Sequence, residues 1–132
     1  MDRLNVITDI LDVAEVRRRL PEVRRAVDRL IEATREIKAR HHELRQLEAG
    51  GRSPRVRRLR AELEDLDAEW RDAVRQVNEL GATVKDPEIG LVDFYAWRHG
   101  EMVFLCWRRD ELDVTHWHGL REGFAGRRRI DF

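Results

Sequence analysis

Cysteine is almost missing from this chain of 132 residues, which contains Cys106 alone. A lone cysteine cannot close a disulfide within the chain, and it cannot supply the paired Cys-x-x-Cys motifs of structural zinc sites. Glycine-rich phosphate loops and nucleophile elbows are missing as well, which excludes the most familiar nucleotide-binding and esterase motifs. Because Cys106 lies in an apolar run, its setting favours a buried small side chain over a reactive thiol.

Long apolar runs are also missing, so the sequence predicts neither a signal peptide nor a membrane span, and we expect a cytoplasmic protein with no membrane partner. An excess of positive charge is missing too, since 26 basic residues balance 26 acidic ones. This balance disfavours nucleic acid as a partner. One uncompensated basic patch is the exception, but it holds no aromatic residues that could stack on bases. The patch comprises Arg52, Arg55, Arg57, Arg58 and Arg60.

Aromatic residues are scarce in the first part of the chain, where Trp70 is the only one before residue 90. This part is instead rich in arginine, glutamate and leucine at helical spacing. We predict a short helix over residues 9–19 that ends at Leu20 and Pro21, because proline removes a hydrogen-bond donor and restricts the residue before it. Pro21 then suits the first turn of a longer helix that runs to about Glu48.

The seam of this longer helix recurs in alternating steps of four and three residues, as in a coiled coil. Its positions are Val23, Val27, Leu30, Thr34, Ile37, His41 and Leu44. Residues 49–52 break the pattern, and Ser53 followed by Pro54 is typical of a new helix start. The second helix repeats the alternation with Trp70 on its seam, and Gly81 suits its C-cap. Two matching seams predict an antiparallel helical hairpin, in which the polar His41 would fix register or association.

Beyond Gly81 the period changes from helical to two, which is typical of strands. Residues 91–97 and 102–108 flank His99 and Gly100, and this glycine supplies the positive φ that a tight turn needs. The loop sets the register of a β-hairpin with one wholly apolar face, formed by the pairs Ala96/Val103, Phe94/Leu105 and Val92/Trp107. The opposite face holds the pairs Trp97/Met102, Tyr95/Phe104 and Asp93/Cys106. Residues 113–117 are a candidate third strand.

The sequence therefore predicts a single α+β domain over residues 1–132. A long antiparallel, coiled-coil-like helical hairpin, preceded by the short helix, forms the part over residues 1–81. A β-hairpin part with a C-terminal polar cluster covers residues 82–132. Because an isolated β-hairpin is only marginally stable in water, its apolar face must pack against the helices.

Linked motifs in the second half of the chain carry a resemblance to a known family. They are Val84-Lys85-Asp86, Gly90-Leu91-Val92-Asp93-Phe94, Leu105-Cys106-Trp107-Arg108, Glu111, Trp117-His118 and Gly123-Phe124-Ala125-Gly126-Arg127. With Ala14-Glu15 and Leu20-Pro21 near the start, the chain resembles the bacterial domain of unknown function 2203 family over nearly its whole length. The resemblance implies a small bacterial protein in which helices precede a β-hairpin, and it implies no established activity. Arg109-Asp110 departs from the glycine turn that is usual in the family at this point.

Asp93 is the sharpest signal of a site, because a carboxylate in an apolar strand is costly unless it is paired, hydrogen-bonded or bound to a cation. His116 and His118 would lie on one face of a strand, and Glu111 is close to them in sequence. Asp93, Glu111 and His118 are therefore candidate ligands for zinc, iron or manganese. The alternative is structural: Asp93 pairs with an arginine, and His118 caps the turn that follows it.

Acidic stripes on the two helices suggest a further candidate. The stripes are Glu32, Glu36 and Glu43 on the first helix and Glu62, Asp65 and Glu69 on the second. We expect Glu36 to lie level with Leu66 and close to Glu69, and two such hairpins would form a four-helix bundle of the kind that holds dimetal sites. Glu69 is therefore the fourth candidate ligand. The alternative, which the pattern favours, is pairing with nearby arginines on a solvated face.

Two functions stay open on these grounds. The first is metal binding at a mono- or dimetal site of iron, manganese or zinc, formed by Asp93, Glu111, His118 and Glu69. The second is a non-catalytic helical interaction module whose polar cluster is only structural. Because two amphipathic seams bury little apolar surface by themselves, we also predict a homodimer formed through the helices. The sequence assigns no substrate or reaction.

Overall fold

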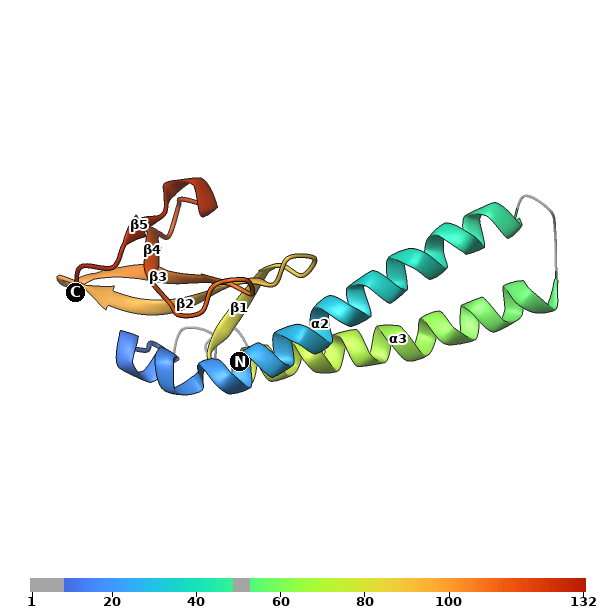
Figure 1. Cartoon of the computed structure of the whole chain (residues 1–132), viewed down its shortest axis with the longest axis horizontal. Coiled ribbons are helices and arrows are strands. Elements are labelled where there is room, and N and C mark those ends of the chain that lie inside the picture. Colours follow the sequence, from blue (N-terminus) through green and yellow to red (C-terminus); the bar gives the residue numbers. More distant parts are fainter. Residues whose placement is uncertain (1–8, 49–52) are drawn as a thin grey trace.

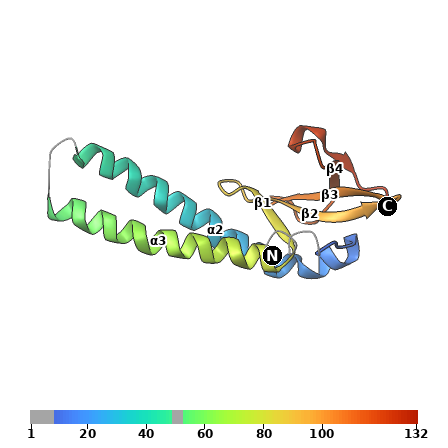
Figure 2. The same ribbon diagram turned by 180° about the vertical axis from the view of Figure 1, so that it is seen from behind.

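Two long helices and an antiparallel sheet make up the part of the chain that the structure, a computed structural model, describes, namely residues 9–48 and 53–132. Helix α2 (Val13–Glu48) and helix α3 (Pro54–Glu79) form an antiparallel hairpin, which confirms that prediction. The sheet lies over the start of α2, and the far end of the hairpin projects away from it (Figures 1 and 2). The fold class is α+β, as predicted.

The sheet is a five-stranded meander, in which each strand pairs with the next one along the chain. Its strands are β1 (Ala82–Asp86), β2 (Leu91–Arg98), β3 (Glu101–Arg108), β4 (His116–Gly119) and β5 (Arg128–Arg129). A short 3₁₀ turn, η1 (Phe124–Gly126), lies between the last two strands. The third strand of the prediction thus begins later than expected, and the sequence reasoning missed β1 and β5.

The register of β2 and β3 confirms the predicted hairpin pair by pair. Asp93 lies opposite Cys106, Phe94 opposite Leu105 and Ala96 opposite Val103. His99 and Gly100 form the turn with φ values of +50° and +84°, the pair of positive angles that a two-residue hairpin loop requires.

The apolar face of this hairpin is buried against the helices. Phe94, Leu105 and Trp107 are fully buried, and they share one core with residues of both helices. The helical side of that core comprises Val16, Leu20, Val23, Ala26, Val27, Ile31 and Val77. Each buried valine, leucine, isoleucine or phenylalanine of this core contributes roughly 1.5–3 kcal/mol, so this contact holds the two parts of the protein together.

The predicted helix break at Pro21 is wrong, because Pro21 lies inside the continuous helix α2. The helix is capped at its start by Asp12, whose Oδ1 accepts a hydrogen bond of 2.7 Å from the Glu15 backbone. Leu20 and Val23 flank the proline and are buried against the sheet. Packing on both sides of Pro21 therefore outweighs the one backbone hydrogen bond that proline removes.

The seam between the helices is tight at both ends and loose in its middle. The base packs under the sheet, whereas Leu44, Val56 and Leu59 form a separate cluster near the tip. Between these clusters Trp70 is half-buried; its indole donates to Thr34 Oγ1 at 2.9 Å. His41 is exposed, which corrects its predicted seam position.

The basic patch at the hairpin tip carries less uncompensated charge than the sequence suggests. Arg55 donates to both carboxylate oxygens of Glu43, at 2.8 and 2.9 Å, so its charge is compensated. Ser53 starts α3 as predicted, since its hydroxyl accepts a hydrogen bond from the Val56 backbone. Residues 49–52, which include Arg52 and the predicted helix break, lie outside the described residues.

Gly90 and Gly100 provide a matched test of how the β1–β2 turn packs on α2. Both have positive φ, +70° and +84°. An added Cβ at Gly90 would lie 2.7 Å from Val27 and 2.9 Å from Ile31, whereas one at Gly100 would meet nothing within 4 Å. We expect Gly100→Ala to cost about 1–2 kcal/mol of backbone strain. Gly90→Ala should cost about 1–3 kcal/mol more through overpacking. Urea unfolding measures both, and equal losses would contradict the packing described.

Candidate metal centre

The outer face of the sheet, turned away from the helices, gathers the polar side chains of the C-terminal half. Side chains alternate along a strand, so burying the apolar face of β2 and β3 places Asp93 and Cys106 on the opposite face. Strand β4 pairs with β3 and brings His118 alongside them. The segment around η1 covers this face of the sheet (Figure 1).

Asp93, Cys106 and His118 form a compact buried group. Their exposed fractions are 2%, 0% and 3%, and one ligand atom from each lies within 4.8 Å of the other two. Within residues 9–48 and 53–132 this is the one group of three or more potential donors close enough to share a metal ion. Cys106 was not predicted as a donor.

The hydrogen bonds of His118 determine what its ring can do. Its Nδ1 lies 2.8 Å from the Gly119 carbonyl oxygen. Because a carbonyl only accepts, Nδ1 must carry a proton. Its Nε2 lies 3.0 Å from both carboxylate oxygens of Asp93. Nε2 and the Asp93 carboxylate therefore share either a proton or a cation between them. His118 has no nitrogen left over for acid–base work on a separate substrate.

Cys106 is a thiol rather than a thiolate when no cation is bound. Burial and then the negative charge of Asp93 raise the pKa of Cys106 to about 12, against a smaller lowering effect of Arg127. A thiol next to a carboxylate serves as a hydrogen-bond donor to Asp93. Only a cation that displaces this proton would convert Cys106 into a strong ligand.

A pocket of about 140 Å³ opens on this group from the outer face. Asp93 and His118 lie among its lining residues, and Lys85 and Glu122 line it as well. The group is therefore buried among side chains but adjacent to a space that a small molecule can enter.

The structure does not bring Glu111 into the group. Its carboxylate accepts from the Arg108 backbone at 2.8 Å and from Arg127 Nη2 at 2.8 Å on each oxygen. His116 Nδ1 lies 4.0 Å from Glu111, and burial followed by the charge of Arg127 lowers the pKa of His116. Glu111 thus ties the turn after β3 to the covering segment, and the prediction that it joins Asp93 and His118 is wrong.

Glu69 is also remote from the group, on helix α3. It lines a groove of about 430 Å³ together with Glu36 and Leu66, as the predicted alignment of the two helices requires. Several of the helical acids pair with arginine, as the alternative interpretation predicted: Arg40 bonds to Glu36 and to Glu62. The prediction that Glu69 is a fourth ligand of the same site is therefore also wrong.

The sequence did contain a signal for Cys106 as a donor. The register of the β-hairpin pairs Cys106 with Asp93, so a thiol and a buried carboxylate had to be neighbours. The position of His118 on β4 could not be predicted from a register in this way, because the pairing of β4 with β3 depends on the long turn between them.

These features define a class: a small α+β protein with a helical hairpin packed on an antiparallel meander, and a buried Asp–Cys–His group beneath an outer pocket. None of the helices in the described residues has the length and apolar character needed to cross a membrane. The chain belongs to the family described as "uncharacterized conserved protein (DUF2203)", whose family model matches residues 10–130. No curated protein and no solved structure matches it.

The interaction between His118 and Asp93 can be tested without metal. His118→Ala leaves the buried Asp93 carboxylate without this partner, which should cost about 3–5 kcal/mol of folding free energy. The matched control is His116→Ala on the same strand and face, which should cost no more than about 1 kcal/mol. Guanidinium unfolding in the presence of a chelator gives both values. Similar small losses for the two variants would show that Asp93 does not depend on His118.

Proposed function

We propose that this protein binds one transition metal ion through Asp93, Cys106 and His118. The observation that carries the proposal is the orientation of His118 within a buried group of three donors. Metal-binding histidines characteristically donate the N–H of one nitrogen to a carbonyl or carboxylate and bind the ion through the other. Here Nδ1 donates to Gly119, and Nε2 faces the Asp93 carboxylate.

Zinc fits this donor set best among the three metals expected. A thiolate is a soft ligand that favours zinc or iron over manganese, and one sulfur, one nitrogen and one oxygen are all ordinary zinc ligands. Three protein ligands leave a fourth position, which the outer pocket could supply with water or a substrate. A zinc ion in such a site supplies a Lewis acid and lowers the pKa of its bound water to about 7.

The metal content of purified protein tests the proposal directly. We expect about one zinc ion per chain when untagged protein is prepared without chelator. Asp93→Asn, Cys106→Ala and His118→Ala should each lose most of the zinc, while His116→Ala and Glu111→Gln should keep it. Circular dichroism confirms that each variant is folded. Equal zinc in all variants, or none in the wild type, would leave the group as a structural cluster.

Proton release gives a second, independent test. The pKa of Cys106 is about 12 without metal, so the thiol is protonated at pH 7 and must lose its proton on binding zinc. Affinity should therefore rise with pH and fall on acidification. Calorimetric titrations in two buffers of different ionisation enthalpy count the protons. At saturating zinc, and counted per zinc ion bound, wild type should release about one proton more than the weaker-binding Cys106→Ala, and equal proton counts would argue against a thiolate ligand.

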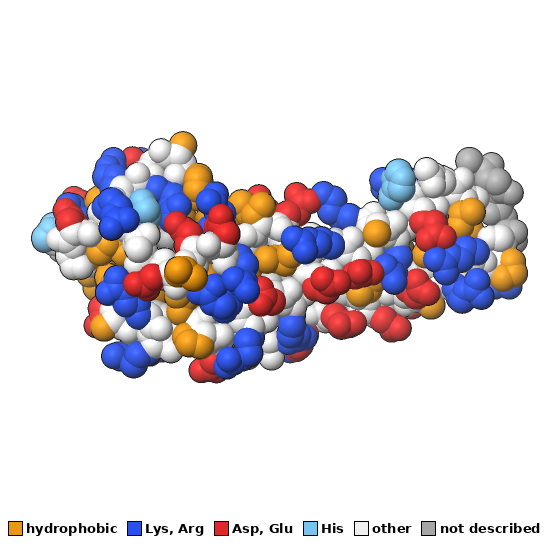
Figure 3. Space-filling model, viewed as in Figure 1, with side chains coloured by type: hydrophobic (Ala, Val, Ile, Leu, Met, Phe, Trp, Pro, Cys, Tyr) orange, Lys and Arg blue, Asp and Glu red, His pale blue; other side chains and the backbone are white. Residues whose placement is uncertain are grey.

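A second candidate function, association of two chains through the helices, is favoured by the loose middle of the hairpin. Ile37 and Leu66 are only half-buried between the tight clusters at base and tip, and Leu63 is half-buried at the edge of the tip cluster. Acidic side chains gather over the middle of the hairpin with apolar atoms exposed between them (Figure 3).

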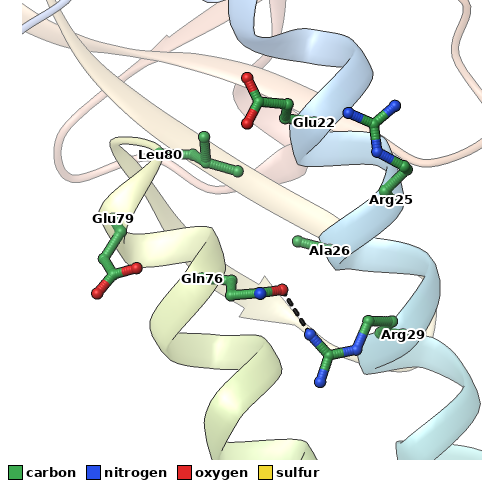
Figure 4. Close-up of a pocket in the computed structure, with 7 residues that line it drawn as sticks. All are labelled: Glu22, Arg25, Ala26, Arg29, Gln76, Glu79 and Leu80. Atoms are coloured by element: carbon green, nitrogen blue, oxygen red, sulfur yellow. Dashed lines mark hydrogen bonds between the residues drawn. The ribbon is translucent and has the colours of Figure 1, made fainter.

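Two hollows on the hairpin share Arg29. One is the groove beside Glu69, and the other, of about 400 Å³, lies at the hairpin base with Ala26 between the helices (Figure 4). Arg29 reaches across to Gln76 at 2.5 Å and to Asp72 at 3.1 Å. A second copy of the chain laid along these hollows would bury the half-exposed seam, as in a four-helix bundle.

Light scattering after gel filtration tests this association. We expect the mass of two chains at tens of micromolar protein. Leu66→Glu places a charge in the groove and should give the mass of one chain, because an unpaired buried charge is costly. Leu112→Glu is the control, since Leu112 is 91% exposed and lines neither of the two hollows. A one-chain mass for the wild type would contradict the dimer.

A further inference from the structure

We infer that the outer pocket beside Asp93 and His118 binds a small carboxylate anion with a short apolar tail. The inference rests on the proposed function, because the metal ion would form part of the site. The pocket itself is present in the structure, and the side chains around it supply the three features that such a ligand needs: one uncompensated positive charge, an apolar wall and a limited volume.

The positive charge is Lys85, one of only two lysines in the chain. Its ammonium lies 4.8 Å from the centroid of the Phe104 ring, in a cation–π contact. Among the described residues no carboxylate pairs with it at salt-bridge distance, whereas the other lysine, Lys38, pairs with Glu88. Lys85 therefore stands at the pocket with its charge unneutralised.

The carboxylates of the pocket already have partners. Glu122 accepts from the Gly119 backbone at 2.8 Å and pairs with Arg128 at 2.9 Å, which neutralises its charge. Asp93 faces His118. A zinc ion with two positive charges would be balanced by the Asp93 carboxylate and the Cys106 thiolate. The remaining net charge is that of Lys85, which a monoanion would balance.

The rest of the wall is apolar. Leu91, Phe104, Leu120 and Phe124 line the pocket, and Leu120 and Phe124 are 46% and 40% exposed at its edge. Exposed apolar side chains beside a cation favour a ligand with a hydrocarbon part next to its charge. The volume of about 140 Å³ equals that of roughly four or five water molecules, which limits the ligand to a few carbon atoms.

Calorimetric titration of zinc-loaded protein with butyrate tests the inference. We expect saturable binding of butyrate and none of butylammonium, which has a similar shape and the opposite charge. Lys85→Met should weaken butyrate binding about tenfold or more, as the loss of one charge-assisted contact predicts. Lys85→Arg should keep most of the affinity, and Lys38→Met, the matched control, should keep all of it. Leu120→Asn should weaken butyrate more than acetate.

The zinc content of each sample separates this inference from the proposal on which it rests. Lys85 and Lys38 are both outside the ligand set, so their variants should hold as much zinc as the wild type. A wild type that holds zinc but shows no saturable binding of butyrate overturns the inference and leaves the metal site standing. Equal butyrate affinity in the wild type and Lys85→Met overturns it as well. A wild type without zinc overturns the proposed function itself.

Discussion

The β2–β3 hairpin can bury only one of its faces against the helices, and this constraint organises the whole protein. Its apolar face meets α2 and the end of α3 in a core that includes Phe94, Leu105 and Trp107. The period of two then forces Asp93 and Cys106 onto the other face, which neither α2 nor α3 covers. A second cover, the segment around η1, is needed to bury that face, and the candidate site lies beneath it.

The site is costly as a purely structural element. A carboxylate, an imidazole and a thiol are almost fully removed from water at one point of a small protein. Replacing such a buried polar group with apolar residues is often neutral or stabilising. The cost is easier to explain when a cation holds the three groups, because the ion compensates the charge of Asp93 and replaces the Cys106 proton. This reasoning favours the metal site over a hydrogen-bonded cluster of the same residues.

Local sequence patterns predicted those parts of the fold that depend on near neighbours. The turn at His99 and Gly100 determines every pair of the β2–β3 register, and Ser53 starts α3 as expected. The errors arose where distant packing decides. Pro21 would end an isolated helix, yet α2 continues through it because Leu20 and Val23 pack under the sheet. His41 was placed in the seam by spacing alone, but the helices do not pack closely at that level.

The candidate site could also be predicted only in part, because local patterns show which side chains share a strand face but not where the later turns direct them. Asp93 was identified from its apolar strand, and His118 from its place on the same strand face as His116. Glu111 was close in sequence, but the turn after β3 directs its carboxylate to Arg127 instead. Cys106 lies in an apolar run like an ordinary core residue, and only its pairing with Asp93 and the position of β4 make it a donor.

X-ray absorption at the zinc edge of the intact, metal-loaded protein tests the central claim most directly. The account predicts one sulfur ligand at about 2.3 Å and the remaining nitrogen and oxygen ligands at about 2.0–2.2 Å. The sulfur contribution should vanish in Cys106→Ala loaded at saturating zinc and persist in His116→Ala. A zinc ion surrounded only by nitrogen and oxygen in the wild type would contradict the account, because the metal would then lie outside the Asp93, Cys106 and His118 group.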